Sequence, residues 1–127
     1  EIDIMELDGD KPNHVLGTLH FGDKWPGNRQ SSGEYVLKDG KFSDDFHVFA
    51  LEWERGEMRW YVDGEQYQTK TKWDSTAAPF PAPFDQRFHL LLNLSIGGRL
   101  VGPPDEETVF PQKFEIDYVR VYQHVSR

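Results

Sequence analysis

HVFALEWERGEMRWYV, residues 47–62, carries the clearest structural signal in the sequence. Its two halves, 47–53 and 58–62, alternate their side chains with the period of two that is typical of a half-buried β-strand. The residues between them, Glu54-Arg55-Gly56-Glu57, are typical of a turn, so the stretch predicts a β-hairpin. Asp63-Gly64 predicts a second tight turn, which leads into a strand at residues 65–70.

Further strands are predicted on both sides of this hairpin, where the period of two recurs and no convincing helical stripe is found. They cover residues 1–7, 14–22, 33–37, 87–96 and 114–123. Residues 23–33 are predicted to form a loop because they are rich in Gly, Pro, Asn and Ser. About eight short strands with regularly spaced turns predict an all-β fold, an antiparallel β-sandwich of jelly-roll type.

The composition narrows the classes of protein to which the chain can belong. Its 127 residues are the length of one domain, and 22 acidic against 14 basic residues give a formal net charge of −8. A nucleic-acid binder neutralises phosphates with Lys and Arg, so we expect no nucleic-acid partner. We expect no membrane partner, because no apolar stretch reaches the roughly 20 residues that span a bilayer. Cysteine is absent, which excludes disulfides and thiolate chemistry.

Aromatic side chains make up 14% of a chain that is only 37% hydrophobic. Most of them are expected in the core, because aromatic residues favour strands and buried positions. Trp53 and Trp60 are interpreted as core or groove floor. Trp25 differs, since it stands alone in the polar loop at 23–33. It either packs within the loop or offers a flat platform for a sugar ring.

Three acidic side chains in the first strand, Glu1, Asp3 and Glu6, form the candidate catalytic site. In a regular strand Glu1 and Asp3 face one side and Glu6 faces the other. One extra residue in a β-bulge at Ile4-Met5 returns Glu6 to the same face. Neighbouring carboxyl groups raise the pKa of at least one of them, and glycoside hydrolysis needs one ionised and one protonated carboxyl. The alternative is a row of acids on the solvent face of an edge strand.

These residues resemble a known family. The run Glu-Ile-Asp-Ile-Met-Glu at residues 1–6 is similar to the bulged active-site signature of glycoside hydrolase family 16, in the form typical of bacterial endo-1,3-β-glucanases, or laminarinases. Four further motifs resemble the family, at residues 17–22, 46–64, 88–98 and 110–123. The resemblance implies a concanavalin A-like jelly roll, of which residues 1–127 correspond to the C-terminal part of the catalytic domain.

The resemblance implies an endo-acting hydrolase of β-1,3-glucan (laminarin) with a retaining double-displacement mechanism. By position, Glu1 matches the nucleophile, Glu6 the general acid/base, and Asp3 the acid between them that tunes both. His20 matches a histidine beside the catalytic strand that reaches the sugar or Glu6, with a satisfied core imidazole as the alternative. Trp25 corresponds to a sugar platform at a leaving-group subsite.

Two further positions follow from the resemblance. Asn93 interrupts an apolar run, and it either hydrogen-bonds substrate or satisfies a bulge. Family members commonly hold a structural Ca²⁺, to which Asp117 in the last predicted strand would contribute. Asp117 alone cannot supply the 6 to 8 oxygens that calcium takes. No cofactor is expected for catalysis itself, and the family implies a secreted, extracellular bacterial protein.

The chain departs from the family in length, because the sequence opens in mid-strand and the half that normally precedes the signature is missing. Half a sandwich leaves strand edges and an apolar face uncovered. We therefore expect either self-association or a complementing N-terminal half. We also expect weaker hydrolysis by this chain than by a full-length relative.

Two other functions compete with hydrolysis. A non-catalytic β-glucan-binding module is the main alternative, and a structural β-domain with incidental acids is the third. Non-catalytic relatives usually lose the acids, whereas this chain keeps all three, which favours the enzyme. Agarases and carrageenases share the architecture, but the charge of −8 disfavours sulfated polyanions.

Overall fold

The computed structural model describes residues 1–124. The chain divides into two compact units, of which the first is Glu1–Leu90 and the second begins at Leu91. All six strands lie in the first unit. Among the described residues, no helix is long and apolar enough to cross a membrane.

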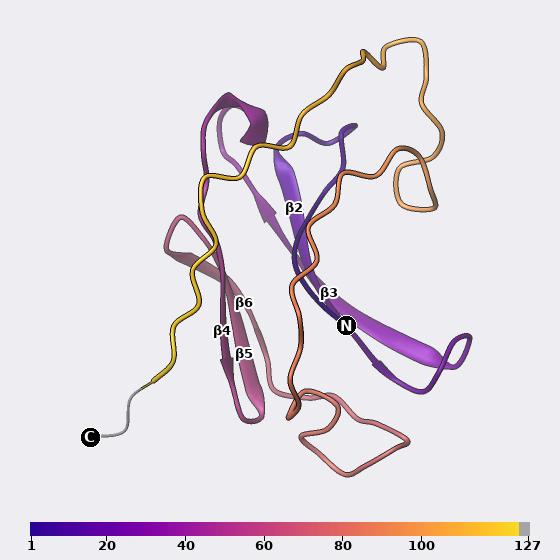
Figure 1. Cartoon of the computed structure of the whole chain (residues 1–127), viewed down its shortest axis with the longest axis vertical. Coiled ribbons are helices and arrows are strands. Elements are labelled where there is room, and N and C mark those ends of the chain that lie inside the picture. Colours follow the sequence, from indigo (N-terminus) through magenta and orange to yellow (C-terminus); the bar gives the residue numbers. More distant parts are fainter. Residues whose placement is uncertain (125–127) are drawn as a thin grey trace. The chain divides into compact units, whose positions relative to one another are not determined.

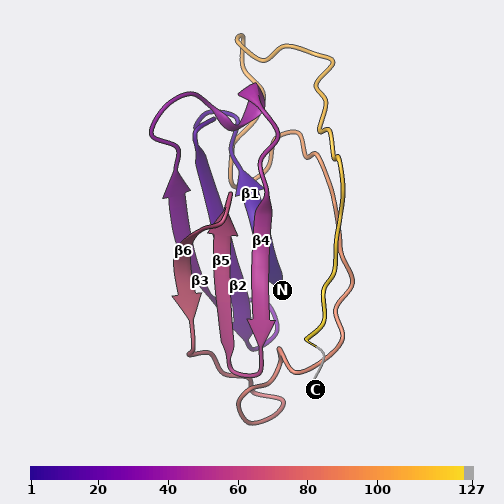
Figure 2. The same cartoon turned by 90° about the vertical axis from the view of Figure 1, so that its left-hand side faces the viewer.

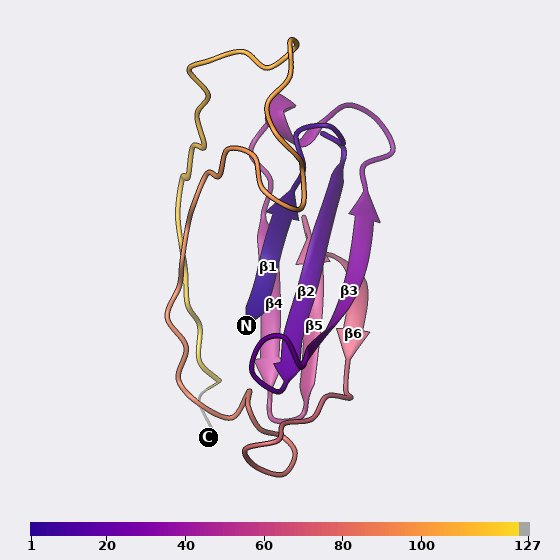
Figure 3. The same ribbon diagram turned by 90° about the vertical axis from the view of Figure 1, so that its right-hand side faces the viewer.

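Two three-stranded antiparallel sheets make up the first unit (Figure 1). One sheet has the order β1-β2-β3, with β1 at Ile2–Leu7, β2 at His14–Gly22 and β3 at Asn28–Val36. The other has the order β4-β5-β6, with β4 at Phe49–Glu54, β5 at Glu57–Val62 and β6 at Glu65–Lys70. A short 3-10 turn, η1, covers Phe42–Asp44. Figures 2 and 3 view the two layers from opposite sides, which confirms the predicted β-sandwich.

The hairpin predicted at residues 47–62 is confirmed as β4 and β5, which pair from Phe49 opposite Val62 to Glu54 opposite Glu57. The tight turn at Asp63-Gly64 is also confirmed. Both of its residues have positive φ values, 51° and 84°, as the two central residues of a type I′ hairpin turn require. The Asp63 carboxylate also accepts a hydrogen bond from the Val48 N–H at 2.8 Å, so the turn is tied to the chain entering β4.

The core lies between the two sheets. Leu19 of β2 and Met58 and Trp60 of β5 are fully buried, and Trp73 and Phe84 extend the same cluster. Removing such side chains from water stabilises the fold by about 1.5–3 kcal/mol each. Trp60 is therefore a core residue, as expected, whereas Trp53 is 39% exposed.

The sheets pack tightly at Gly17 of β2 and Gly33 of β3, which stand opposite each other in the ladder. A Cβ added at Gly17 would lie 2.5 Å from the Trp60 ring and 2.5 Å from the Tyr67 hydroxyl. A Cβ at Gly33 would lie 2.2 Å from the side-chain oxygen of Gln68. The missing side chains make room for the buried Gln68 of β6, whose amide donates to the Gly17 carbonyl at 2.9 Å.

The prediction of a loop at 23–33 followed by a short strand at 33–37 is wrong, because β3 runs from Asn28 to Val36. It pairs with β2 along its whole length, from Gly22 opposite Asn28 to His14 opposite Val36. Its polar and small residues carry no apolar alternation. The strand is therefore stabilised by its ladder with β2, a long-range pairing that local composition does not encode.

The strands predicted at 87–96 and 114–123 are also wrong for the described structure, which leaves six strands rather than eight. A strand is held by hydrogen bonds to a neighbour, and within residues 1–124 neither segment has a ladder partner. In the second unit, taken by itself, large apolar side chains are exposed. Leu91 is 77% and Val121 is 84% exposed.

Candidate active site

The predicted β-bulge in β1 is confirmed by the register against β2. Asp3 stands opposite Thr18 and Glu6 opposite Leu16, so three steps along β1 match two steps along β2. The extra residue returns Glu6 to the face that carries Asp3. The ladder continues to Glu1, whose carbonyl accepts the His20 N–H at 3.0 Å. β1 is an edge strand, and its outer face presents the three predicted acids beside β2.

Asp3 lies between the other two acids and interacts electrostatically with both of them. Its side chain is 16% exposed. Burial, and then the negative charges of Glu6 and Glu1, raise the pKa of Asp3 from 3.8 to about 6. His20 acts in the opposite direction, and a hydrogen bond with Glu1 favours the protonated Asp3. Below about pH 6, Asp3 is therefore mainly a neutral carboxylic acid.

His20 lies next to this group, as predicted. Its Nε2 atom is 3.2 Å from Oδ2 of Asp3, and the imidazole is 26% exposed. Oδ2 is buried and makes no hydrogen bond with the described residues, so the contact is electrostatic rather than an aligned hydrogen bond. His20 thus contacts Asp3 directly, and the contact to Glu6 that the resemblance allowed is not the one observed.

Glu6 is held by hydroxyl groups of the neighbouring strands. The Thr18 hydroxyl of β2 donates to Oε2 of Glu6 at 3.0 Å. The Ser32 hydroxyl of β3 lies 3.0 Å from the Thr18 hydroxyl. Neither residue was singled out in the sequence. The period of two places Thr18 on the face of His20, but Ser32 had no signal because its strand was predicted as a loop.

The backbone of the acidic strand is fixed from the opposite sheet. The indole N–H of Trp60, which is fully buried in β5, donates to the carbonyl of Asp3 at 3.0 Å. Ile2 and Met5 on the inner face of β1 pack against the core clusters. Their burial turns the acids outward, because neighbouring residues of a strand face opposite sides.

An open groove of about 390 Å³ adjoins this strand and unites three predicted residues. Glu1, His20 and Trp25 all contribute to its lining, together with Asn28 of β3 and the segment Ser75–Ala77. Trp25 is 71% exposed and lines the groove, so its indole is not part of the core. An aromatic face beside hydroxyl-binding side chains is the usual composition of a sugar site.

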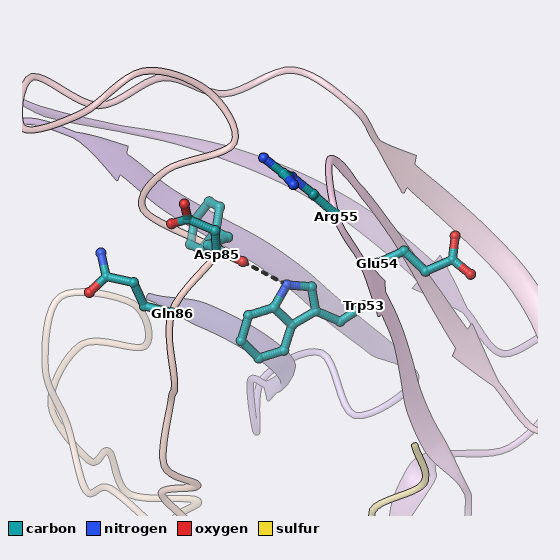
Figure 4. A pocket seen from close by; sticks show the side chains of 6 residues that line it. Trp53, Glu54, Arg55, Asp85 and Gln86 are labelled. Carbon is teal, nitrogen blue, oxygen red and sulfur yellow. Dashed lines mark hydrogen bonds between the residues drawn. The ribbon is translucent and has the colours of Figure 1, made fainter. Parts of the chain in front are cut away.

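A second hollow, of about 480 Å³, lies at the turn between β4 and β5. Trp53, Arg55, Asp85 and Gln86 are among the residues that line it. Figure 4 shows that the indole N–H of Trp53 is already used, because it donates to the carbonyl of Phe84 at 2.9 Å. The lining includes none of the residues predicted for the site.

Asn93 and Asp117 belong to the second unit and are exposed there. The side chain of Asn93 accepts a hydrogen bond from Ser95 at 3.2 Å. Within residues 1–124 no three His, Cys, Asp or Glu residues gather as a metal site would need. The assignment of Asp117 as a ligand stays a prediction without support.

A β-sandwich whose edge strand presents three coupled carboxyl groups beside a groove lined by an aromatic residue is the arrangement that the resemblance to a glycoside hydrolase family predicts. The chain belongs to the glycosyl hydrolases family 16, whose family model matches residues 1–120.

Comparison with known proteins agrees with this assignment. The chain is 44% identical over 130 residues to the glucan endo-1,3-beta-glucosidase A1 of Niallia circulans, covering 97% of this chain and 19% of the relative. It is 38% identical to the beta-1,3-glucan-binding protein of Penaeus monodon, covering 77% of this chain and 33% of the relative.

A solved structure supports the jelly-roll type of the sandwich. The endo-beta-1,3-glucanase of Pyrococcus furiosus matches with a TM-score of 0.69 and 36% identity, over 87% of this chain and 42% of that chain. The chain thus spans less than half the length of each of these relatives.

Proposed function

We propose that the chain carries the catalytic strand of an endo-acting hydrolase of β-1,3-glucan that retains anomeric configuration. The observation that supports this most is the bulge in β1, which sets Glu1, Asp3 and Glu6 on one face. Coupling of Asp3 to both glutamates and the groove that contains Glu1, His20 and Trp25 add to it. The Niallia circulans relative is an endo-1,3-beta-glucosidase by name.

In the first step, the carboxylate of Glu1 attacks the anomeric carbon of the bound sugar. The bond from that carbon to the glycosidic oxygen breaks, and this oxygen takes a proton from Glu6. The step leaves a glycosyl ester on Glu1 and an ionised Glu6. A protonated Asp3 assists by donating a hydrogen bond to the Glu1 carboxylate without adding a third negative charge.

In the second step, Glu6 takes a proton from a water molecule whose oxygen attacks the same anomeric carbon. The ester bond to Glu1 breaks, and both carboxyl groups return to their starting states. Two inversions at one carbon retain the β configuration. Transfer to a sugar hydroxyl in place of water would be transglycosylation by the same chemistry.

Substrate binding is assigned to the groove beside Glu1. The exposed indole of Trp25 is suited to stack on a glucosyl ring at a leaving-group subsite. His20 lines the same groove and contacts Asp3, so we assign to it a contact with the bound sugar. A polysaccharide substrate is met outside the cell, so we place the protein there.

Release of reducing sugar from laminarin tests the proposal. The chain is expected to release reducing ends, and Glu6→Gln is expected to lower the rate by about 10²–10⁴-fold, the usual contribution of a general acid–base group. Glu65→Gln, which changes a strand glutamate on β6, is the matched control and should keep the wild-type rate. Equal rates in the Glu6→Gln variant and the wild type would refute the assignment.

A non-catalytic glucan-binding module is the second candidate, because one relative is a beta-1,3-glucan-binding protein by name. Its site would use the same groove and Trp25. Retention of the chain by immobilised laminarin without release of reducing sugar would favour this function over hydrolysis.

We further propose that the chain works with a partner, either a second copy or a complementing N-terminal half. The exposed apolar side chains of residues 91–124 support this, since such side chains are usually covered. Light scattering after size exclusion separates the alternatives. A dimer indicates self-association, and a compact monomer at high concentration contradicts it. An aggregate that is rescued by a separately supplied N-terminal half of a family domain indicates complementation.

A further inference from the structure

We propose that Thr18, ordered by Ser32, is a positioning residue that occupies Oε2 of Glu6 and leaves Oε1 as the oxygen that exchanges a proton with the substrate. The inference deepens the proposed function, because it assigns separate tasks to the two oxygens of the acid/base. It names one residue on β2 and one on β3, neither of which belongs to the acidic strand.

The hydroxyl of Thr18 is hydrogen-bonded to Glu6, and the residue is buried. It donates to Oε2 at 3.0 Å, and Thr18 is only 2% exposed. Water therefore has little access to replace this donor. The pair also spans the bulge, where the register between β1 and β2 shifts just before Glu6. A side-chain hydrogen bond thus holds Glu6 at a point where the ladder is irregular.

The direction of the hydrogen bonds follows from counting protons. An ionised carboxylate only accepts, so the single hydroxyl proton of Thr18 is used on Glu6. The hydroxyl of Ser32, 3.0 Å from that of Thr18, must then donate to it. Lys70 of β6 donates to the backbone carbonyl of Ser32 at 3.0 Å, which ties this part of β3 to the second sheet.

The two carboxyl oxygens of Glu6 therefore have different hydrogen-bonding environments. Oε2 accepts from Thr18 in the ionised state, and it can still accept when the carboxyl is protonated on Oε1. The arrangement therefore favours the tautomer whose proton sits on Oε1. A proton on Oε2 would instead meet the Thr18 hydroxyl proton and require that hydroxyl to turn away. Protonated Glu6 therefore carries its proton on Oε1, the oxygen that has no hydrogen bond to Thr18.

The test compares substrates that differ in their need for a general acid. In laminarin the leaving group is a sugar hydroxyl, which must be protonated as the bond breaks. In a dinitrophenyl β-laminaribioside the leaving group is dinitrophenolate, which departs without a proton. Thr18→Val removes the hydroxyl at constant shape, and Thr18→Ser restores it. Thr69→Val removes an exposed strand hydroxyl on β6 and is the matched control.

We expect Thr18→Val to lower kcat/KM on laminarin by about tenfold, the lower end of the range for a hydrogen bond to a charged group. The same variant should lose less than about twofold on the aryl glycoside, and Thr18→Ser should recover most of the loss. Ser32→Ala should show a smaller loss with the same substrate dependence. Equal losses on both substrates would indicate a merely structural role and overturn the inference, as would no loss.

A second measurement does not depend on turnover, so it separates failure of this inference from failure of the proposed function. In the chain labelled with carbon-13 at Glu side chains, the carboxyl signal of Glu6 should move in Thr18→Val and in Ser32→Ala. It should stay in place in Thr69→Val. An unmoved Glu6 signal in Thr18→Val would overturn the inference even in a chain that hydrolyses laminarin. A wild-type chain inactive on both substrates would count against the proposed function alone.

Discussion

At the scale of single residues, Asp3 is the group whose chemistry most distinguishes this site. Burial and the charges of Glu6 and Glu1 raise its pKa to about 6. The folded chain therefore binds the Asp3 proton more tightly than the unfolded chain, whose value is near 3.8. The stability that this group contributes is complete below about pH 4 and is lost as the pH rises through about 6.

We predict that Asp3→Asn flattens the pH dependence of stability. Between pH 4 and pH 7 the wild type should lose on the order of 2–3 kcal/mol through this group, because each unit of pKa shift is worth about 1.4 kcal/mol. The variant should not show that loss. Urea unfolding at each pH measures the difference, with Asp39→Asn in an exposed turn as the control. Parallel pH profiles for the wild type and Asp3→Asn would contradict the raised pKa.

The three acids could be predicted from the sequence because their spacing, with one bulge, is a local property. Thr18 and Ser32 could not be assigned in the same way. Their hydroxyls act on Glu6 only because Asp3, Thr18 and Ser32 stand in one row across three strands. That row depends on strand register, which the alternation of side chains fixes only where one face is apolar.

At the scale of elements, the close approach of the two sheets decides where the acidic strand lies. Gly17 and Gly33 leave room for Gln68, and Trp60 donates to the Asp3 carbonyl from the opposite sheet. The sequence predicted the hairpin β4–β5 and the core position of Trp60. It gave no sign of the facing glycines, since their role exists only after β2 and β3 pair.

We predict that Gly17→Ala destabilises the chain by about 1–3 kcal/mol, the usual cost of overpacking a core. The added methyl group would lie 2.5 Å from both the Trp60 ring and the Tyr67 hydroxyl. Gly9→Ala is the control, because nothing lies within 4 Å of its added Cβ. The midpoint of urea unfolding measures both variants, and an unchanged midpoint for Gly17→Ala would show that the sheets are not packed so closely.

The segment at 87–96, which was predicted as a strand and is not one in the described structure, shows the limit of prediction from sequence patterns. Its run Leu90-Leu91-Leu92 is apolar enough for a buried strand. Apolarity alone does not supply the backbone partners that a strand requires, and the described residues contain none for it. β3 is the reverse case, since its composition is that of a loop and its ladder with β2 makes it a strand.

At the scale of the whole molecule, the assignment to a family and the proposal of a catalytic mechanism rest on different observations. The match of the family model over residues 1–120 shows the family. The chain spans 42% of the Pyrococcus furiosus glucanase, so more than half of that protein has no counterpart among these residues. The catalytic proposal therefore depends on the strand that carries Glu1, Asp3 and Glu6.

The central claim is that Glu1 forms a covalent bond to the sugar. Incubation with a dinitrophenyl 2-deoxy-2-fluoro-β-laminaribioside, followed by mass spectrometry of the peptides, tests it most directly, because the fluorine slows hydrolysis of the glycosyl ester. We predict a single added 2-deoxy-2-fluoro-laminaribiosyl group on Glu1, formed in Glu6→Gln as well because the aryl leaving group needs no acid. A label on another residue, or an unlabelled Glu1 in a chain that cleaves laminarin, would contradict the account.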